Sequence, residues 1–139
     1  MTDLLRDDEY ERRFAGVAKI YGDSAFQHYA QSHVMVIGIG GVGSWAVEAL
    51  ARTGIGELTL VDMDVVAASN INRQLPAMSS TLGHEKINVM AERCRSINPR
   101  IKINLVDDYL SPDNVKVLLA TAPDLILDCI DDVKAKLAL

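Results

Sequence analysis

Two cations in this chain have the residue types and spacing that phosphate chemistry needs. Arg73 lies in a polar run, residues 69–74, which follows Asp62 and Asp64, and Lys86 comes shortly after it. An arginine and a lysine that converge on one end of a nucleotide can hold a triphosphate and neutralise a departing pyrophosphate. A hydride-transfer site has no need of that pair. The sequence therefore predicts that Arg73 and Lys86 hold phosphates.

A group of carboxylates follows a later apolar run. Asp128, Asp131 and Asp132 lie at the carboxyl edge of the last predicted strand, beside the crevice where open α/β sheets bind ligands. Carboxylates in that place suit Mg²⁺ held jointly with phosphate oxygens. One alternative stays open, because Asp131 and Asp132 are also suitable caps for the final helix.

A glycine-rich turn precedes all of these side chains. Gly38, Gly40 and Gly43 form G-x-G-x-x-G after the apolar run 34–37. The first glycine permits the tight turn, the second lets a phosphate approach the backbone, and the third lets helix pack on strand. Asp62 ends the next apolar run, where an acid can accept hydrogen bonds from ribose hydroxyls. A purely structural turn is the alternative, and the strand, helix and acid at the right distances disfavour it.

Alternating strands and helices must position these residues. Apolar runs predict strands at 34–37, 58–61, 101–105 and 125–130. The alternation implies an α/β fold with a Rossmann-like parallel sheet, right-handed crossovers and helices on both faces. Residues 1–31 predict an N-terminal helical appendage, and residues 32–139 predict the Rossmann-like ATP-binding domain. Because the chain ends inside what reads as a new helix, we expect a truncated N-terminal part, with this domain incomplete at its C-terminus.

Composition narrows the class of protein. The 139 residues are 49% hydrophobic and 24% charged, which is typical of a soluble globular protein. The sequence has no run near the roughly 20 apolar residues of a membrane span, and its polar, acidic start is unlike a secretory signal, so we expect a cytoplasmic protein. Cys94 and Cys129 lack metal or disulfide spacing and are expected in the core. Trp45 is expected to be a packing residue. The net charge of −5 argues against a broad nucleic-acid surface within this segment.

These motifs together resemble a known superfamily. G-x-G-G-V-G-S, V-D-x-D-x-V, S-N-x-N-R-Q, Lys86 and D-C-x-D-D occur in that order between about Arg13 and Leu139. They are similar to the ThiF/MoeB/HesA adenylating superfamily, which includes relatives of ubiquitin-activating enzymes. The segments GVGSWAVEALARTGIG and SPDNV are most similar to the branch that acts on threonylcarbamoyladenosine in tRNA.

The resemblance implies ATP-dependent activation of a carboxylate. Such an enzyme binds ATP with Mg²⁺, forms an acyl-adenylate and releases pyrophosphate. In this branch the carboxylate belongs to the threonyl group of the modified adenosine, and ring closure then expels AMP with a net loss of water. The resemblance also implies a tRNA carrying threonylcarbamoyladenosine as partner, a homodimer, and association with a cysteine desulfurase sulfur relay.

The family's functional positions carry over residue by residue. The resemblance places Gly41 against the phosphates and assigns Mg²⁺ to Asp131, and the predicted catalytic residues are Arg73, Lys86 and Asp131. The predicted nucleotide-binding residues are Gly38, Gly40, Gly41, Gly43, Asp62, Asp64, Asn70, Arg73, Gln74 and Lys86. Relatives that activate sulfur carriers often have an arginine where this chain has Gly16, so an arginine supplied in trans is not implied.

Three other functions stay open. Adenylation of the C-terminal glycine of a ubiquitin-like sulfur carrier uses the same chemistry, and the net acidity of the segment fits a protein partner. An NAD-dependent oxidoreductase would use Asp62 but leave Arg73, Lys86 and Asp131 without a role. A non-catalytic nucleotide-binding or dimerisation module is the third. Taken singly, Arg73 and Lys86 fit solvated surface cations, and Asn70 fits an Asx turn.

Overall fold

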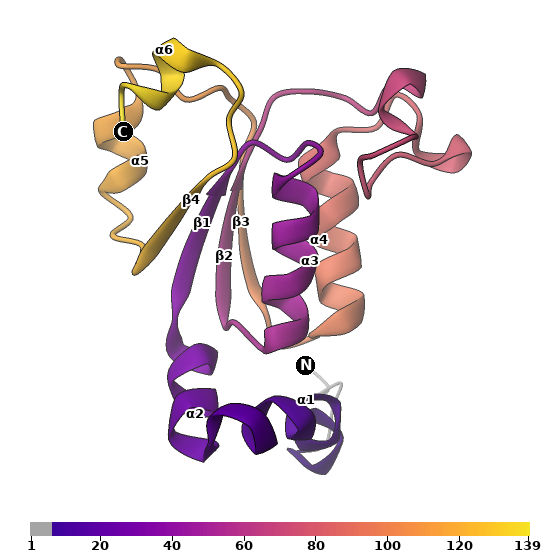
Figure 1. Cartoon of the computed structure of the whole chain (residues 1–139), viewed down its shortest axis with the longest axis vertical. Helices are drawn as coiled ribbons and strands as arrows, with labels where there is room; N and C mark the ends of the chain where they lie inside the picture. The colour runs from indigo at the N-terminus through magenta and orange to yellow at the C-terminus, as the bar shows by residue number, and fades with distance from the viewer. Residues whose placement is uncertain (1–6) are drawn as a thin grey trace, which may run out of the picture.

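The computed structural model describes residues 7–139 and shows a parallel sheet between two layers of helices, with further helices beneath it (Figure 1). The first six residues of the predicted 1–31 appendage lie outside the described residues. The α/β prediction and the helices on both faces of the sheet are confirmed.

The sheet has the order β3-β2-β1-β4 and all its neighbouring strands are parallel. Its strands are β1 (His33–Ile37), β2 (Glu57–Val61), β3 (Lys102–Val106) and β4 (Leu125–Asp128). After β3 the chain crosses to the far side of β1, so the strand order reverses between β1 and β4. The fourth strand is shorter than predicted, because the Asp128 carboxylate accepts a hydrogen bond from the Ile130 amide and closes a local turn.

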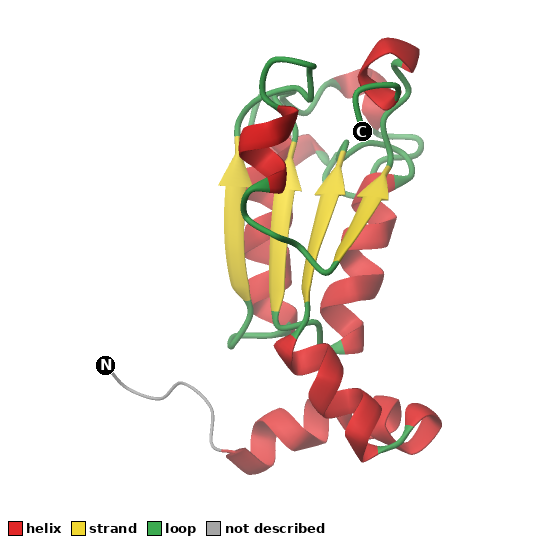
Figure 2. Ribbon diagram, turned by 90° about the vertical axis from the view of Figure 1, so that its left-hand side faces the viewer, coloured by secondary structure: helices red, strands yellow, loops and turns green. Residues whose placement is uncertain are grey.

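Two helices cover one face of the sheet. The helices α3 (Gly43–Thr53) and α4 (Lys86–Ile97) pack there against the sheet, in a core that includes Val47, Ala51, Met90 and Cys94. The short helix α5 (Val115–Leu119) lies on the opposite face, where Leu118 packs against Met35 and Ile37. Figure 2 looks onto this second face, with α5 in front of the strands. Among residues 7–139, no helix is both long and apolar enough to cross a membrane.

The remaining helices lie at the two ends of the sheet. At the amino ends of the strands are α1 (Asp7–Tyr21) and α2 (Asp23–Gln31), which confirm a helical N-terminal appendage (Figure 1). Phe14 is 2% exposed and its ring lies 6.1 Å from that of Phe26. The Gly56 amide donates to the Tyr29 carbonyl, which fastens α2 to the start of β2. At the carboxyl ends lies α6 (Val133–Lys136). The division into domains at residues 31 and 32 stays a prediction.

Candidate functional site

A cleft of about 970 Å³ opens at the carboxyl ends of the strands, across the point where the strand order reverses. Ligands of open α/β sheets bind at such a point. Every predicted site residue except Gly43 lines it, namely Gly38, Gly40, Gly41, Asp62, Asp64, Asn70, Arg73, Gln74, Lys86 and Asp131. The structure therefore brings together residues from five separate segments of the chain.

Two glycines of the turn are required by the protein itself. Gly38 has a φ of 92°, and a Cβ on it would lie 2.7 Å from the Cys129 carbonyl oxygen. A Cβ on Gly43 would lie 1.6 Å from the Gly38 carbonyl oxygen. Any larger residue at either position would therefore displace backbone, which explains why Gly43 shapes the turn without lining the cleft.

The other two glycines have no such requirement. A Cβ on Gly40 or Gly41 would meet only side-chain atoms of Gln74 or Arg73, at the ordinary contact distances of 3.5 and 3.6 Å. The fold alone would thus tolerate a methyl group at both positions. Because Gly40 and Gly41 have no side chain, the backbone is exposed to the cleft beside the start of α3. An anionic phosphate can approach such a surface closely.

Asp62 braces this turn. The residue is 9% exposed, and its Oδ2 accepts a 2.7 Å hydrogen bond from the Ile39 amide while Oδ1 accepts one of 2.7 Å from the Asp64 amide. A carboxylate has about four acceptor sites, so two remain for other donors. The position at the end of β2 and these free lone pairs fit the predicted contact with ribose hydroxyls.

Lys86 is a buried cation that faces the cleft. The residue is only 5% exposed, and its Nζ lies 3.5 Å from Asp64 Oδ2. That carboxylate is itself 48% exposed and also accepts a hydrogen bond from the Tyr109 hydroxyl. Burying an ammonium is costly unless it is well paired, and a single half-exposed acid neutralises it incompletely. The alternative of an ordinary surface lysine is therefore wrong, and Lys86 can accept an anionic ligand.

Arg73 presents a second cation. Its Nη1 donates to the Ser69 carbonyl and to Asn72 Oδ1, both at 3.0 Å. Within residues 7–139 the guanidinium has no carboxylate partner, so its charge is available to a phosphate. Trp45 holds the loop in place, because its indole N–H donates to the Arg73 carbonyl at 3.0 Å. Trp45 was expected to be a packing residue, but 55% of it is exposed.

Two amides complete this side of the cleft. Asn70 Oδ1 accepts a 2.9 Å hydrogen bond from the Ala67 amide, which is the local turn that sequence analysis left open as an alternative. Gln74 is 8% exposed, and in the described part of the chain its buried Oε1 has no hydrogen-bond partner. Buried polar atoms are normally paired. The Gln74 atom that lies nearest a Cβ placed on Gly40 is Nε2, at 3.5 Å, so the amide group borders the glycine turn.

Two neighbouring carboxylates, Asp131 and Asp132, have different contacts in the cleft. Asp132 caps α6 by accepting a 2.8 Å hydrogen bond from the Ala135 amide. Asp131 is exposed, lines the cleft and has no side-chain partner in the range 7–139. The capping alternative therefore applies to Asp132 alone. No group of three His, Cys, Asp or Glu side chains among the described residues is arranged to hold a metal, so Mg²⁺ here would require phosphate oxygens and water as additional ligands.

Among the lining residues that sequence reasoning missed are Tyr109 and Lys134. Tyr109 follows β3, and its hydrogen bond to Asp64 raises the pKa of the phenol to about 12. Lys134 enters from α6. Their positions after predicted parallel strands could have indicated this, because segments that follow the carboxyl ends of parallel strands meet at the same edge of the sheet.

The chain matches known proteins over most of its length. The family model described as "ThiF family" matches residues 10–139. The tRNA threonylcarbamoyladenosine dehydratase of Haemophilus influenzae is 52% identical over 139 residues, which are 100% of this chain and 53% of that protein. A crystal structure of the Escherichia coli tRNA N6-threonylcarbamoyladenosine dehydratase in complex with ATP is 48% identical, with a TM-score of 0.94 over 98% of this chain and 56% of that chain.

A relative with another activity is more distant. The molybdopterin-synthase adenylyltransferase of Escherichia coli is 38% identical over 105 residues, which are 76% of this chain and 42% of that protein. The chain spans about half the length of the dehydratases that it matches.

Proposed function

The chain belongs to the ThiF family, and we propose that it forms the nucleotide-binding part of an ATP-dependent enzyme that dehydrates threonylcarbamoyladenosine in tRNA. The observation that carries the proposal is the cationic wall of the cleft. Lys86 is buried with one half-exposed carboxylate partner, and Arg73 has none among the described residues. An NAD-dependent oxidoreductase would leave both charges without a role.

The proposed reaction uses the two halves of the cleft differently. Asp62 takes the ribose, and the triphosphate lies over Gly40 and Gly41 with Arg73 and Lys86 beside it. A substrate carboxylate oxygen attacks the α-phosphorus, and the bond to the bridging oxygen breaks, so that pyrophosphate leaves with the bonding electrons. The two cations neutralise the charge that develops on it. An intramolecular attack on the activated acyl group then closes a ring and expels AMP. The substrate has then lost one molecule of water overall.

Asp131 is the proposed protein ligand of Mg²⁺. Its exposed carboxylate follows β4 and lines the cleft, and it has no side-chain partner among residues 7–139. Bound Mg²⁺ would supply charge neutralisation for the phosphates, and its remaining ligands would be phosphate oxygens and water.

The macromolecular partners belong to the same proposal. The names of the dehydratase relatives support a tRNA carrying threonylcarbamoyladenosine as the substrate. The family resemblance supports a homodimer, a cysteine desulfurase relay and a cytoplasmic location. Light scattering of the purified protein tests the homodimer directly, since a dimer has twice the chain mass of 15.2 kDa.

Calorimetric titration of this chain with Mg-ATP and with NAD tests the nucleotide. We expect saturable binding of ATP and none of NAD, and binding of NAD alone would overturn the proposal. For the acyl substrate, the protein expressed at the full length of its gene is given ATP labelled at the α-phosphate. Release of labelled AMP should require the modified tRNA. Labelling of a ubiquitin-like carrier protein instead would favour the activity of the adenylyltransferase relatives.

A further inference from the structure

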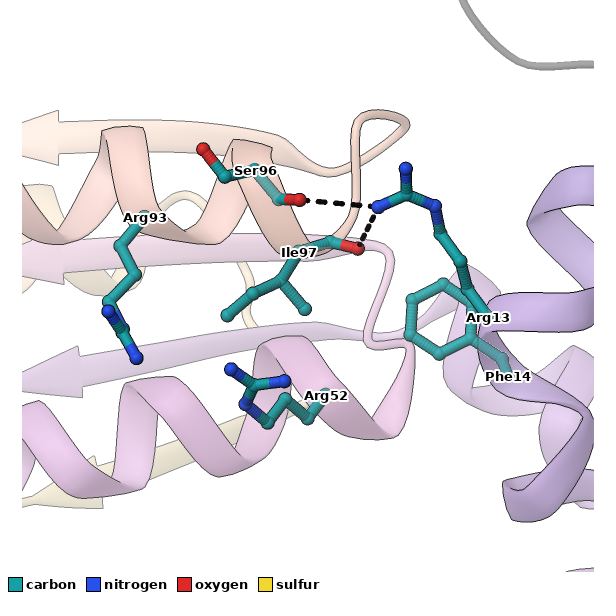
Figure 3. A pocket seen from close by; sticks show the side chains of 6 residues that line it. All are labelled: Arg13, Phe14, Arg52, Arg93, Ser96 and Ile97. Carbon is teal, nitrogen blue, oxygen red and sulfur yellow. Dashed lines mark hydrogen bonds between the residues drawn. The ribbon is translucent and has the colours of Figure 1, made fainter.

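A second hollow, of about 450 Å³, lies at the other end of the molecule, where the appendage meets the far ends of α3 and α4 (Figures 1 and 3). Its lining consists of Arg13, Phe14, Arg52, Arg93, Ser96 and Ile97. The three arginines come from three different helices, α1, α3 and α4. In a chain with a net charge of −5, such a convergence of cations calls for an explanation.

One carboxylate serves two of these arginines. Glu48 accepts a 2.8 Å hydrogen bond from Arg52 Nε and bonds of 2.5 and 2.9 Å from Arg93 Nε and Nη2. The hydrogen bond from Arg93 lowers the pKa of Glu48, so the carboxylate is ionised at neutral pH. This group therefore carries two positive charges against one negative charge.

The third arginine is fixed by the end of a helix. Arg13 Nη1 donates to the carbonyls of Ser96 and Ile97 at 3.2 and 3.0 Å, and its Nη2 lies 3.3 Å from Glu9. In Figure 3 the head group of Arg13 lies on one side of Ile97, and those of Arg52 and Arg93 lie on the other. Glu9 and Glu48 thus face three guanidinium groups, which leaves an excess of positive charge.

The hollow also has unused hydrogen-bond donors. Arg52 binds Glu48 through Nε only, so both of its terminal nitrogens are without a partner among residues 7–139. Arg93 likewise has a spare Nη1 within the same range. The side chains of Arg52 and Arg93 are 58% and 43% exposed, so these donors can reach a ligand. The guanidinium fork matches the geometry of a phosphate better than that of any neutral ligand.

We propose that this hollow is a phosphate-binding site, separate from the nucleotide cleft, in which Arg52 and Arg93 donate to phosphate oxygens. The phosphate is either a phosphodiester of an RNA backbone or a small free phosphate. The RNA alternative rests on the proposed function, whereas the site itself does not. The competing explanation is that the arginines only fasten the appendage to the α3 and α4 layer.

The first test follows the arginine Nε–H signals in ¹H–¹⁵N spectra of the whole chain during titration with inorganic phosphate at constant ionic strength. We expect saturable shifts at Arg52 and Arg93, and these signals distinguish the hollow from phosphate bound in the cleft. Arg52→Ala should weaken this binding about three- to tenfold. Arg95→Ala on α4 removes the same charge outside the hollow and should leave it unchanged. Absence of saturation, or equal losses in both variants, would overturn the proposal.

The second test identifies the source of the phosphate. A tRNA anticodon stem-loop is titrated at several salt concentrations with the same variants. If the RNA backbone is the ligand, Arg52→Ala weakens binding and makes the slope of log K against log salt shallower by up to about one. If RNA binding is unchanged while the phosphate shifts disappear, the site takes a small phosphate. Both results support the site, and neither depends on whether ATP binds in the cleft.

Discussion

At the scale of single residues, Arg73 and Lys86 carry equal charges that the fold neutralises to different degrees. Lys86 has a carboxylate at 3.5 Å, whereas Arg73 donates only to a carbonyl and an amide oxygen. Asp64 also receives the Tyr109 hydroxyl, which reduces its capacity to neutralise Lys86. Both cations therefore gain from a triphosphate, and Arg73 is the simpler one to test because removing it orphans no carboxylate.

Arg73→Ala should weaken Mg-ATP binding about 10- to 100-fold, because a charge-assisted hydrogen bond to phosphate is lost. Adenosine binding should stay within about twofold, since the proposed contact involves phosphate only. Calorimetry with both ligands measures the difference, and Arg95→Ala serves as the charge-matched control. Equal losses for ATP and adenosine would remove Arg73 from the phosphates.

Asp131→Asn should raise the Mg²⁺ concentration needed for ATP binding by roughly tenfold, because an amide oxygen is a weaker ligand than a carboxylate. Metal-free nucleotide binding should change little. Asp113→Asn removes a charge from an exposed position outside the cleft and provides the control. An unchanged Mg²⁺ dependence would show that Asp131 is not a ligand.

At the scale of elements, the glycine turn combines two different requirements. Gly43 is needed by the fold, since its Cβ would lie 1.6 Å from a backbone oxygen, but Gly41 is free of such a clash. Gly43→Ala should therefore destabilise the protein by about 3 kcal/mol or more. Gly41→Ala should fold normally and lose ATP affinity at least about tenfold, because the methyl group occupies the proposed phosphate position. Thermal unfolding and calorimetry separate the two effects, and normal ATP binding by Gly41→Ala would contradict the proposed pose.

The α3–α4 contact should depend on pH through Glu48. Arg93 holds the folded-state pKa of this carboxyl below its ordinary value of 4.5. Its contribution to stability is thus present above that value and is lost as pH falls through the lower folded-state pKa. Glu48→Gln should cost roughly 1 kcal/mol at pH 7, a modest figure because both arginines are partly exposed.

The same cost should shrink as the pH falls through the lowered folded-state pKa of Glu48, because both forms carry a neutral side chain at this position once that carboxyl is protonated. Urea unfolding over a series of pH values from 7 downward measures the trend. Glu92→Gln on the exposed part of α4 is the control. A cost for Glu48→Gln that is independent of pH would mean that shape, and not charge, joins the two helices.

Local spacing determined which of these elements could be predicted. The glycine turn and Asp62 follow one another along the chain, so their pattern alone predicts a nucleotide pocket. Tyr109 and Lys134 reach the cleft only through the sheet order β3-β2-β1-β4, which no local pattern encodes. Trp45 was misjudged because composition favours burial, whereas its indole N–H finds its partner at the Arg73 carbonyl.

At the scale of the whole molecule, the sheet separates two charged sites. The cleft lies at the carboxyl ends of the strands, and the arginine hollow lies near their amino ends (Figure 1). The hollow unites Arg13, Arg52 and Arg93, whose separation in the sequence gave no motif to detect. The appendage contributes Arg13 and Phe14 to the hollow, so the stability of its contact with the far end of α3 decides whether the two sites belong to one folding unit.

Phe14→Ala tests that contact. The ring is buried at 2% exposure and packs on Phe26, and both rings lie against Gly54 at the end of α3. Removing it should cost about 3–5 kcal/mol. If the appendage and the sheet form one cooperative unit, the variant should have the same lowered unfolding midpoint by helical circular dichroism and by Trp45 fluorescence. Ile20→Ala, 75% exposed on the same helix, should shift neither. A Trp45 transition that stays in place while helical signal is lost earlier would instead make residues 1–31 a separate domain.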